Sequence, residues 1–87
     1  MNQYKLAEIY YGKKNGKDIK KAWYVYYSFL NPETGKYKVF QEKRGINRYK
    51  TIKERTAEAI MLRDAINADL KDGFNPFLTV QTNSKIS

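Results

Sequence analysis

Polar side chains that can contact a nucleic acid gather on one side of two predicted strands. Successive residues of a strand point to opposite faces, so alternate positions share a surface. The members of this set are Tyr24, Tyr26, Ser28, Gln41 and Lys43. Ammonium groups neutralise phosphates, whereas amides and hydroxyls form hydrogen bonds with base edges. Taken alone, Tyr24 and Tyr26 are more typical of a solvated sheet face.

The charge distribution favours the nucleic-acid interpretation. Residues 1–50 hold twelve Lys and Arg against four acidic residues, which accounts for the whole surplus of eight, and residues 51–87 hold five of each sign. A chain with its charge concentrated in one half is suited to bind a polyanion through that half.

Further cations lie close to the predicted face in sequence. They are Lys36, Lys38 and Arg44 beside the hairpin, Lys13 and Lys14 in the loop 13–21, and Arg48 before the helix. We expect them to grip phosphates at the edges of the face. For the loop 13–21, a flexible solvated segment is an equal alternative.

The composition disfavours an enzyme. There is no Cys and no His, so thiolate metal sites and the commonest general base are missing, and no phosphate-binding loop or dinucleotide motif occurs. We expect no cofactor, no metal and no small-molecule substrate. No segment is typical of a signal peptide or a membrane span, which predicts a soluble, cytoplasmic protein with no membrane partner.

Three strands are predicted in the basic half. The strongest covers 22–29, AWYVYYSF, and a hairpin loop at Asn31–Gly35 joins it to a partner at 36–43. A weaker strand at 6–11 completes the sheet, because two strands alone are marginal. Trp23 and Phe40 are assigned to the core face.

The neutral half predicts one helix. Thr51 and Glu54 form a capping box, and Gly73 is placed to end the helix. An apolar stripe recurs at spacings of three and four: Ala59, Leu62, Ile66 and Leu70, with Ile52, Met61 and Ala65 at its margins. Acidic residues of the helix are expected to line a solvated face or to pair with Arg55, Arg63 and Lys71.

These elements predict an α+β domain of two layers, a three-stranded antiparallel sheet packed on one C-terminal helix. The domain spans residues 1–77, and 78–87 read as a linker or tail. The sheet face opposite the helix is then left uncovered.

The run AWYVYYSFLNPETGKYKVF, the turn at 44–47, TIKERTAEA and the closing DGFNPF resemble the N-terminal arm-type DNA-binding domain of tyrosine recombinases, the integrases of phages and conjugative transposons. The resemblance covers about residues 5–77. It implies a non-catalytic module that lays its sheet into the major groove of arm-type sites. A core-binding and catalytic region would follow the tail, and double-stranded DNA and other recombinase subunits would be the partners.

Val39 and Leu30 depart from the expected pattern because they are apolar on the predicted reading face. Either they contact thymine methyl groups or the strand register is shifted by one residue. Two other functions remain open: a single-strand or RNA-binding platform that uses the aromatic face, and a protein-interaction domain that uses the neutral helix.

Overall fold

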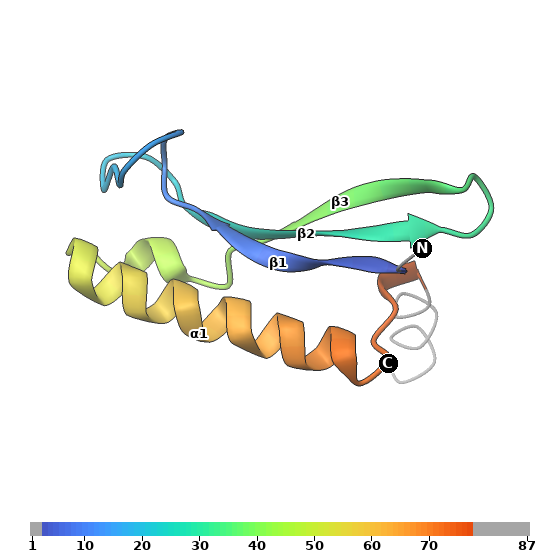
Figure 1. Cartoon of the computed structure of the whole chain (residues 1–87). Helices are drawn as coiled ribbons and strands as arrows, with labels where there is room; N and C mark the ends of the chain where they lie inside the picture. The colour runs from blue at the N-terminus through green and yellow to red at the C-terminus, as the bar shows by residue number, and fades with distance from the viewer. Residues whose placement is uncertain (1–2, 78–87) are drawn as a thin grey trace.

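A computed structural model of the 87-residue chain describes residues 3–77. Its elements in chain order are β1 (Tyr4–Tyr10), β2 (Tyr24–Asn31), β3 (Lys36–Glu42), a 3-10 helix η1 (Ile46–Arg48) and α1 (Ile52–Lys71). The strands form one antiparallel sheet in the order β1-β2-β3, and α1 crosses one face of it (Figure 1). The predicted α+β fold of two layers is confirmed. The predicted tail 78–87 lies outside the described residues.

Burial alternates along the central strand β2, so one face of the sheet is covered and the other is open. Val25, Tyr27 and Phe29 are buried with α1, while the residues between them are only half-buried. Tyr27 stands opposite Phe40 in β3, and their rings stack at 5.4 Å between centroids. The assignment of Phe40 to the core face is therefore confirmed.

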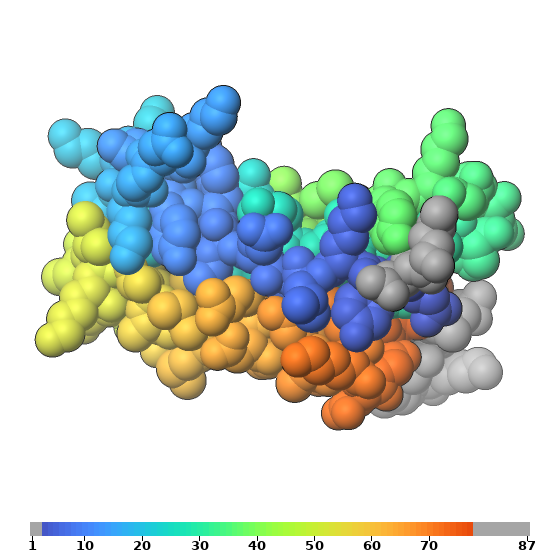
Figure 2. Space-filling view, viewed as in Figure 1, coloured from blue at the N-terminus to red at the C-terminus, as the bar shows by residue number. Residues whose placement is uncertain are grey.

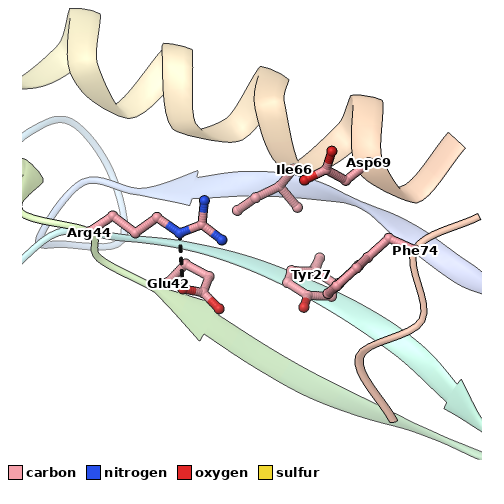
Figure 3. A pocket seen from close by; sticks show the side chains of 6 residues that line it. All are labelled: Tyr27, Glu42, Arg44, Ile66, Asp69 and Phe74. Atoms are coloured by element: carbon pink, nitrogen blue, oxygen red, sulfur yellow. Dashed lines mark ion pairs between the residues drawn. The ribbon is translucent and has the colours of Figure 1, made fainter. Parts of the chain in front are cut away.

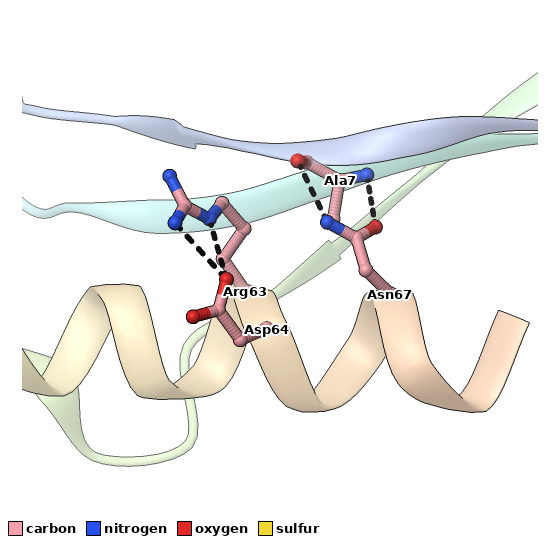
Figure 4. Close-up of polar contacts among 4 residues, drawn as sticks. All are labelled: Ala7, Arg63, Asp64 and Asn67. Atoms are coloured by element: carbon pink, nitrogen blue, oxygen red, sulfur yellow. Dashed lines mark hydrogen bonds and ion pairs between the residues drawn. The ribbon is translucent and has the colours of Figure 1, made fainter. Parts of the chain in front are cut away.

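Strand β1 contains an irregularity that the sequence did not predict. Its register with β2 shifts between Lys5 and Glu8, which places two residues of β1 opposite one of β2. Ala7 lies at this bulge, where its amide donates to Asn67 Oδ1 at 2.7 Å and its carbonyl accepts from Asn67 Nδ2 at 3.5 Å (Figure 4). The side-chain amide of Asn67, on α1, thus forms hydrogen bonds with the backbone N–H and C=O of Ala7, which the bulge leaves without a partner strand.

Both ends of α1 are capped. Thr51 Oγ1 accepts from the Glu54 amide at 3.2 Å, as predicted, but the Glu54 carboxylate accepts from the Thr51 hydroxyl instead of reaching its amide. At the other end, the amide of Phe74 donates to the Asp69 carbonyl and that of Gly73 to the Leu70 carbonyl, the Schellman pattern. Gly73 has a φ of 99°, which glycine adopts without strain.

The apolar stripe of α1 is confirmed, with one unexpected member. Ala59, Leu62, Ile66 and Leu70 are buried, and the predicted marginal positions Ile52, Met61 and Ala65 are exposed. The fifth buried residue of the helix is Arg55.

Within residues 3–77, Arg55 forms no ion pair with an acidic residue, so the pairing considered for it from the sequence is corrected. Its guanidinium lies 5.3 Å from the Trp23 ring centroid and donates to four backbone carbonyls. These acceptors belong to Ile19, Lys21, Asn47 and Tyr49. Because they come from the loop before β2 and from the segment around η1, Arg55 joins both to the start of α1.

Trp23 is the predicted core anchor and is fully buried. Its indole donates to the Asp18 carbonyl at 2.8 Å, and its own backbone amide and carbonyl pair with the side chain of Asn47. The loop 13–21 is therefore anchored to the core through Asp18 and Trp23, although most of its residues are exposed.

Candidate nucleic-acid interface

The face of the sheet away from α1 is built from rows of side chains that cross the strands. One row contains Glu8, Tyr26 and Gln41, and the next contains Lys5, Ser28 and Val39. Two shorter rows flank them, Tyr10 with Tyr24 and Leu30 with Tyr37. We call these ten residues the open face. It includes four of the predicted site residues: Tyr24, Tyr26, Ser28 and Gln41.

Three tyrosines form an aromatic cluster at one end of the open face. Tyr10 and Tyr24 stack across β1 and β2 with 4.9 Å between ring centroids, and Tyr26 meets Tyr24 edge-on at 6.0 Å. Each ring of the stacked pair thus has one face occupied by its neighbour.

A cation lies at the other end of the open face. Lys5 Nζ is 4.7 Å from the centroid of the Tyr37 ring, although the two residues come from the outer strands β1 and β3. The lysine therefore leans over the central strand. Such a contact is worth about 0.5–1 kcal/mol at an exposed site and leaves the ammonium group accessible to a phosphate.

Tyr26 keeps its phenol proton at neutral pH. Partial burial raises its pKa above the ordinary value of 10, and the neighbouring Glu8 carboxylate and Tyr24 raise the pKa further. A neutral phenol both donates and accepts hydrogen bonds, so Tyr26 can bond a phosphate oxygen or a base edge.

The loop between β1 and β2 carries Lys13 and Lys14, which are both exposed. In Figure 1 this loop rises at one end of the sheet on the side away from α1. Figure 2 shows that the surface is lower over the middle of the sheet than at this loop or at the turn between β2 and β3. The open face is therefore the floor of a shallow saddle, and the two lysines stand at one of its raised ends.

Two predicted contacts lie on the other side of the sheet. Lys38 stands opposite Phe29 and Lys36 opposite Asn31, positions that share the face of the half-buried Phe40. The Lys38 ammonium lies 5.3 Å from the Phe40 ring centroid. The expectation that both lysines flank the reading face is corrected. Residues of one strand whose numbers differ by an odd number point to opposite faces, so Lys36 and Lys38 point away from the face of Gln41.

Arg44 also lies on the helix side. Its Nε is 3.5 Å from Glu42 Oε1, and both side chains line a hollow of about 40 Å³ with Tyr27, Ile66, Asp69 and Phe74 (Figure 3). Burial and the Glu42 carboxylate raise the pKa of Tyr27, while Arg44 opposes that rise. The expectation that Arg44 flanks the reading face is therefore corrected.

The remaining predicted cations lie at the borders of the domain. Lys43 is exposed just after the last residue of β3. Arg48 ends η1, where it donates to the Tyr49 hydroxyl at 3.2 Å, and this hydrogen bond raises the pKa of the guanidinium further above its ordinary value. Both side chains are exposed.

Three members of the open face were missed from the sequence: Lys5, Glu8 and Tyr10. For the predicted strand at 6–11, the sequence did not show which residues face away from the helix. The bulge also shifts the alternation, so residues before it and residues after it follow different patterns. An uninterrupted alternation would have placed Lys5 and Glu8 on opposite faces.

Neither a family model nor a curated protein nor a solved structure matches the chain. Across residues 3–77, no helix is long and apolar enough to cross a membrane. In the same part of the chain, acidic side chains form no group of three that could hold a metal ion.

Proposed function

We propose that this chain is a sequence-specific double-stranded DNA-binding module that places its open face in a major groove. The observation that carries the proposal is the division of the sheet into two faces. One face is filled by α1, and the other presents hydroxyl, amide and ammonium groups between a lysine-rich loop and the hairpin. The major groove is wide enough to admit such strands and displays a distinct pattern for each base pair.

The net charge of plus eight supports the choice of a polyanion as the partner. Lys5 supplies a cation on the face itself, and Lys13 and Lys14 supply cations at its raised end. Phosphate contacts, such as those we propose for Lys13 and Lys14, position a protein on the duplex. Contacts between base edges and side chains on the open face select the sequence.

The resemblance to arm-type domains of tyrosine recombinases supports a narrower role. In this role the module binds arm-type sites and positions a recombinase for integration or excision of a mobile element. Catalysis would belong to another region of the recombinase, and the module itself would cleave no DNA.

A single-stranded nucleic acid is the second candidate, and the cluster of Tyr10, Tyr24 and Tyr26 favours it. Bases stack on aromatic rings in such proteins. Here, however, Tyr10 and Tyr24 stack on each other and Tyr26 meets Tyr24 edge-on, and the rest of the open face is not a continuous aromatic platform. We therefore favour the duplex.

Competition binding separates the two candidates. Duplexes selected from a random pool by the chain are labelled, and unlabelled duplex or either single strand is added as competitor. We expect the duplex to compete best and affinity to fall steeply with salt. Single strands that outcompete the duplex would contradict the proposal, and so would equal affinity for all duplexes.

A pair of matched variants tests whether the open face makes the contact. Lys5→Gln removes one cation from the open face, and Lys71→Gln removes one from the exposed last turn of α1. We expect Lys5→Gln to weaken binding and to reduce the salt slope by about one, whereas Lys71→Gln leaves both nearly unchanged. The reverse order of effects would place the DNA on the helix.

A further inference from the structure

Val39 is an apolar side chain at the β3 end of an otherwise polar row. It stands opposite Ser28 on the open face, in the same row as Lys5 of β1, and 56% of its surface is exposed. The register observed for β2 and β3 removes the possibility that Val39 belongs to the core. Its exposed methyl groups are thus available to a partner that binds this face.

Gln41 lies two residues further along β3, on the same face and also exposed. Two residues of a strand span roughly 7 Å, which is about two base-pair steps of DNA. A strand aligned with the groove would therefore bring Val39 and Gln41 to nearby base pairs at the same time.

We propose that Gln41 and Val39 together make the module select A·T pairs at two nearby positions. The Gln41 amide donates to adenine N7 and accepts from adenine N6, and Val39 packs against the methyl group of a thymine. This inference rests on the proposed duplex binding and adds which bases are selected and which residues select them.

The chemistry of the two side chains disfavours the other bases. Guanine presents two acceptors in the major groove, whereas a glutamine amide pairs best with the donor and acceptor of adenine. Cytosine carries no methyl group, so Val39 would lose its apolar contact there. Tyr26 stands opposite Gln41, and its neutral phenol bonds a neighbouring edge or phosphate without repelling it.

Single-atom changes in the DNA test the inference. A preferred duplex is first selected from a random pool by the 87-residue chain. Each thymine of that duplex is then replaced in turn by deoxyuridine, which lacks only the methyl group, and each adenine by 7-deazaadenine, which lacks the N7 acceptor. Dissociation constants are measured for the chain and for Val39→Ala and Gln41→Ala.

We expect one deoxyuridine position to weaken binding about threefold or more for the unmodified chain and to have no effect on Val39→Ala. One 7-deazaadenine position within about two base pairs of it should weaken binding by roughly fivefold or more, and should have no effect on Gln41→Ala. Gln41→Arg should move the preference at that pair from adenine to guanine, a change that a merely structural role would not produce.

Met61→Ala is the control, because Met61 is similarly exposed but lies on α1. It should respond to both base changes as the unmodified chain does. The inference would be overturned if Val39→Ala and Gln41→Ala still lost affinity on these base replacements. It would also be overturned if the unmodified chain lost none. Either result would leave duplex binding intact. Absence of any selected duplex would overturn the proposed function as well.

Discussion

Tyr26 combines two properties at the centre of the open face, a raised pKa and a position beside Gln41. Because its folded-state pKa lies above the ordinary value of 10, its proton favours the folded state. That contribution is fully present below pH 10 and is lost as the pH rises through the folded-state pKa. At neutral pH the phenol is protonated, so neither the charge of the open face nor the stability of the fold changes with pH through this group.

The Glu8 carboxylate is one cause of the raised pKa of Tyr26. In Glu8→Gln the carboxylate is removed, so the pKa of Tyr26 should fall toward its ordinary value but stay above it, because burial is the larger cause. A titration of the tyrosine ring carbons by NMR measures this directly. An unchanged pKa would show that Glu8 does not act on Tyr26.

Arg55 is the residue whose loss should damage the fold most directly. It is only 4% exposed and bonds four carbonyls from two segments that precede α1. Arg55→Met leaves these acceptors without their donor, which should lower the free energy of unfolding by at least about 3 kcal/mol. Urea denaturation provides the measurement.

Arg63→Ala is the matched control for that substitution. Arg63 forms an ion pair with the adjacent Asp64 on the surface of α1 at 3.0 Å (Figure 4). Exposed pairs of this kind contribute less than about 1 kcal/mol. Equal costs for the two arginines would refute the role assigned to Arg55.

At the scale of elements, the bulge of β1 depends on a side chain from α1. Asn67→Ala removes the acceptor of the Ala7 amide, so this amide should exchange with solvent faster and the free energy of unfolding should fall by about 1–3 kcal/mol. Asn15→Ala, in the exposed loop, should change neither quantity. Hydrogen exchange followed by NMR distinguishes the two, and an unchanged Ala7 rate in Asn67→Ala would contradict the account.

The elements could be predicted from local patterns, because each signal lies within a few residues. The alternation in 22–29 identified β2, Thr51 and Glu54 identified the start of α1, and Phe40 identified the register of the hairpin. Their physical causes, side-chain alternation and capping, act over short distances along the chain.

The parts that were missed or misplaced depend on contacts between distant segments. Arg55 resembles any surface arginine of a helix until the carbonyls of Ile19 and Asn47 are seen around it. The bulge in β1 is stabilised from 60 residues away by Asn67, and it decides the faces of Lys5 and Glu8. Lys36 and Lys38 were expected at the edge of the reading face because they lie close to it in sequence, although alternation along β3 puts them on the opposite face.

At the scale of the whole molecule, the charge asymmetry follows the two layers. The basic half of the chain forms the sheet, its loop and η1, and the neutral half forms α1. Of the predicted cations outside the strands, Lys13 and Lys14 stand beside the open face, whereas Arg44 lies against the helix side. We therefore expect the DNA to meet the molecule from the side opposite α1.

An NMR titration of the chain with its selected duplex tests this central claim most directly. The claim predicts that the largest chemical-shift changes occur at Lys5, Tyr26, Val39 and Gln41 and in the loop that carries Lys13, while the exposed side of α1 around Met61 stays unchanged. Shifts confined to α1, with the open face unaffected, would contradict it.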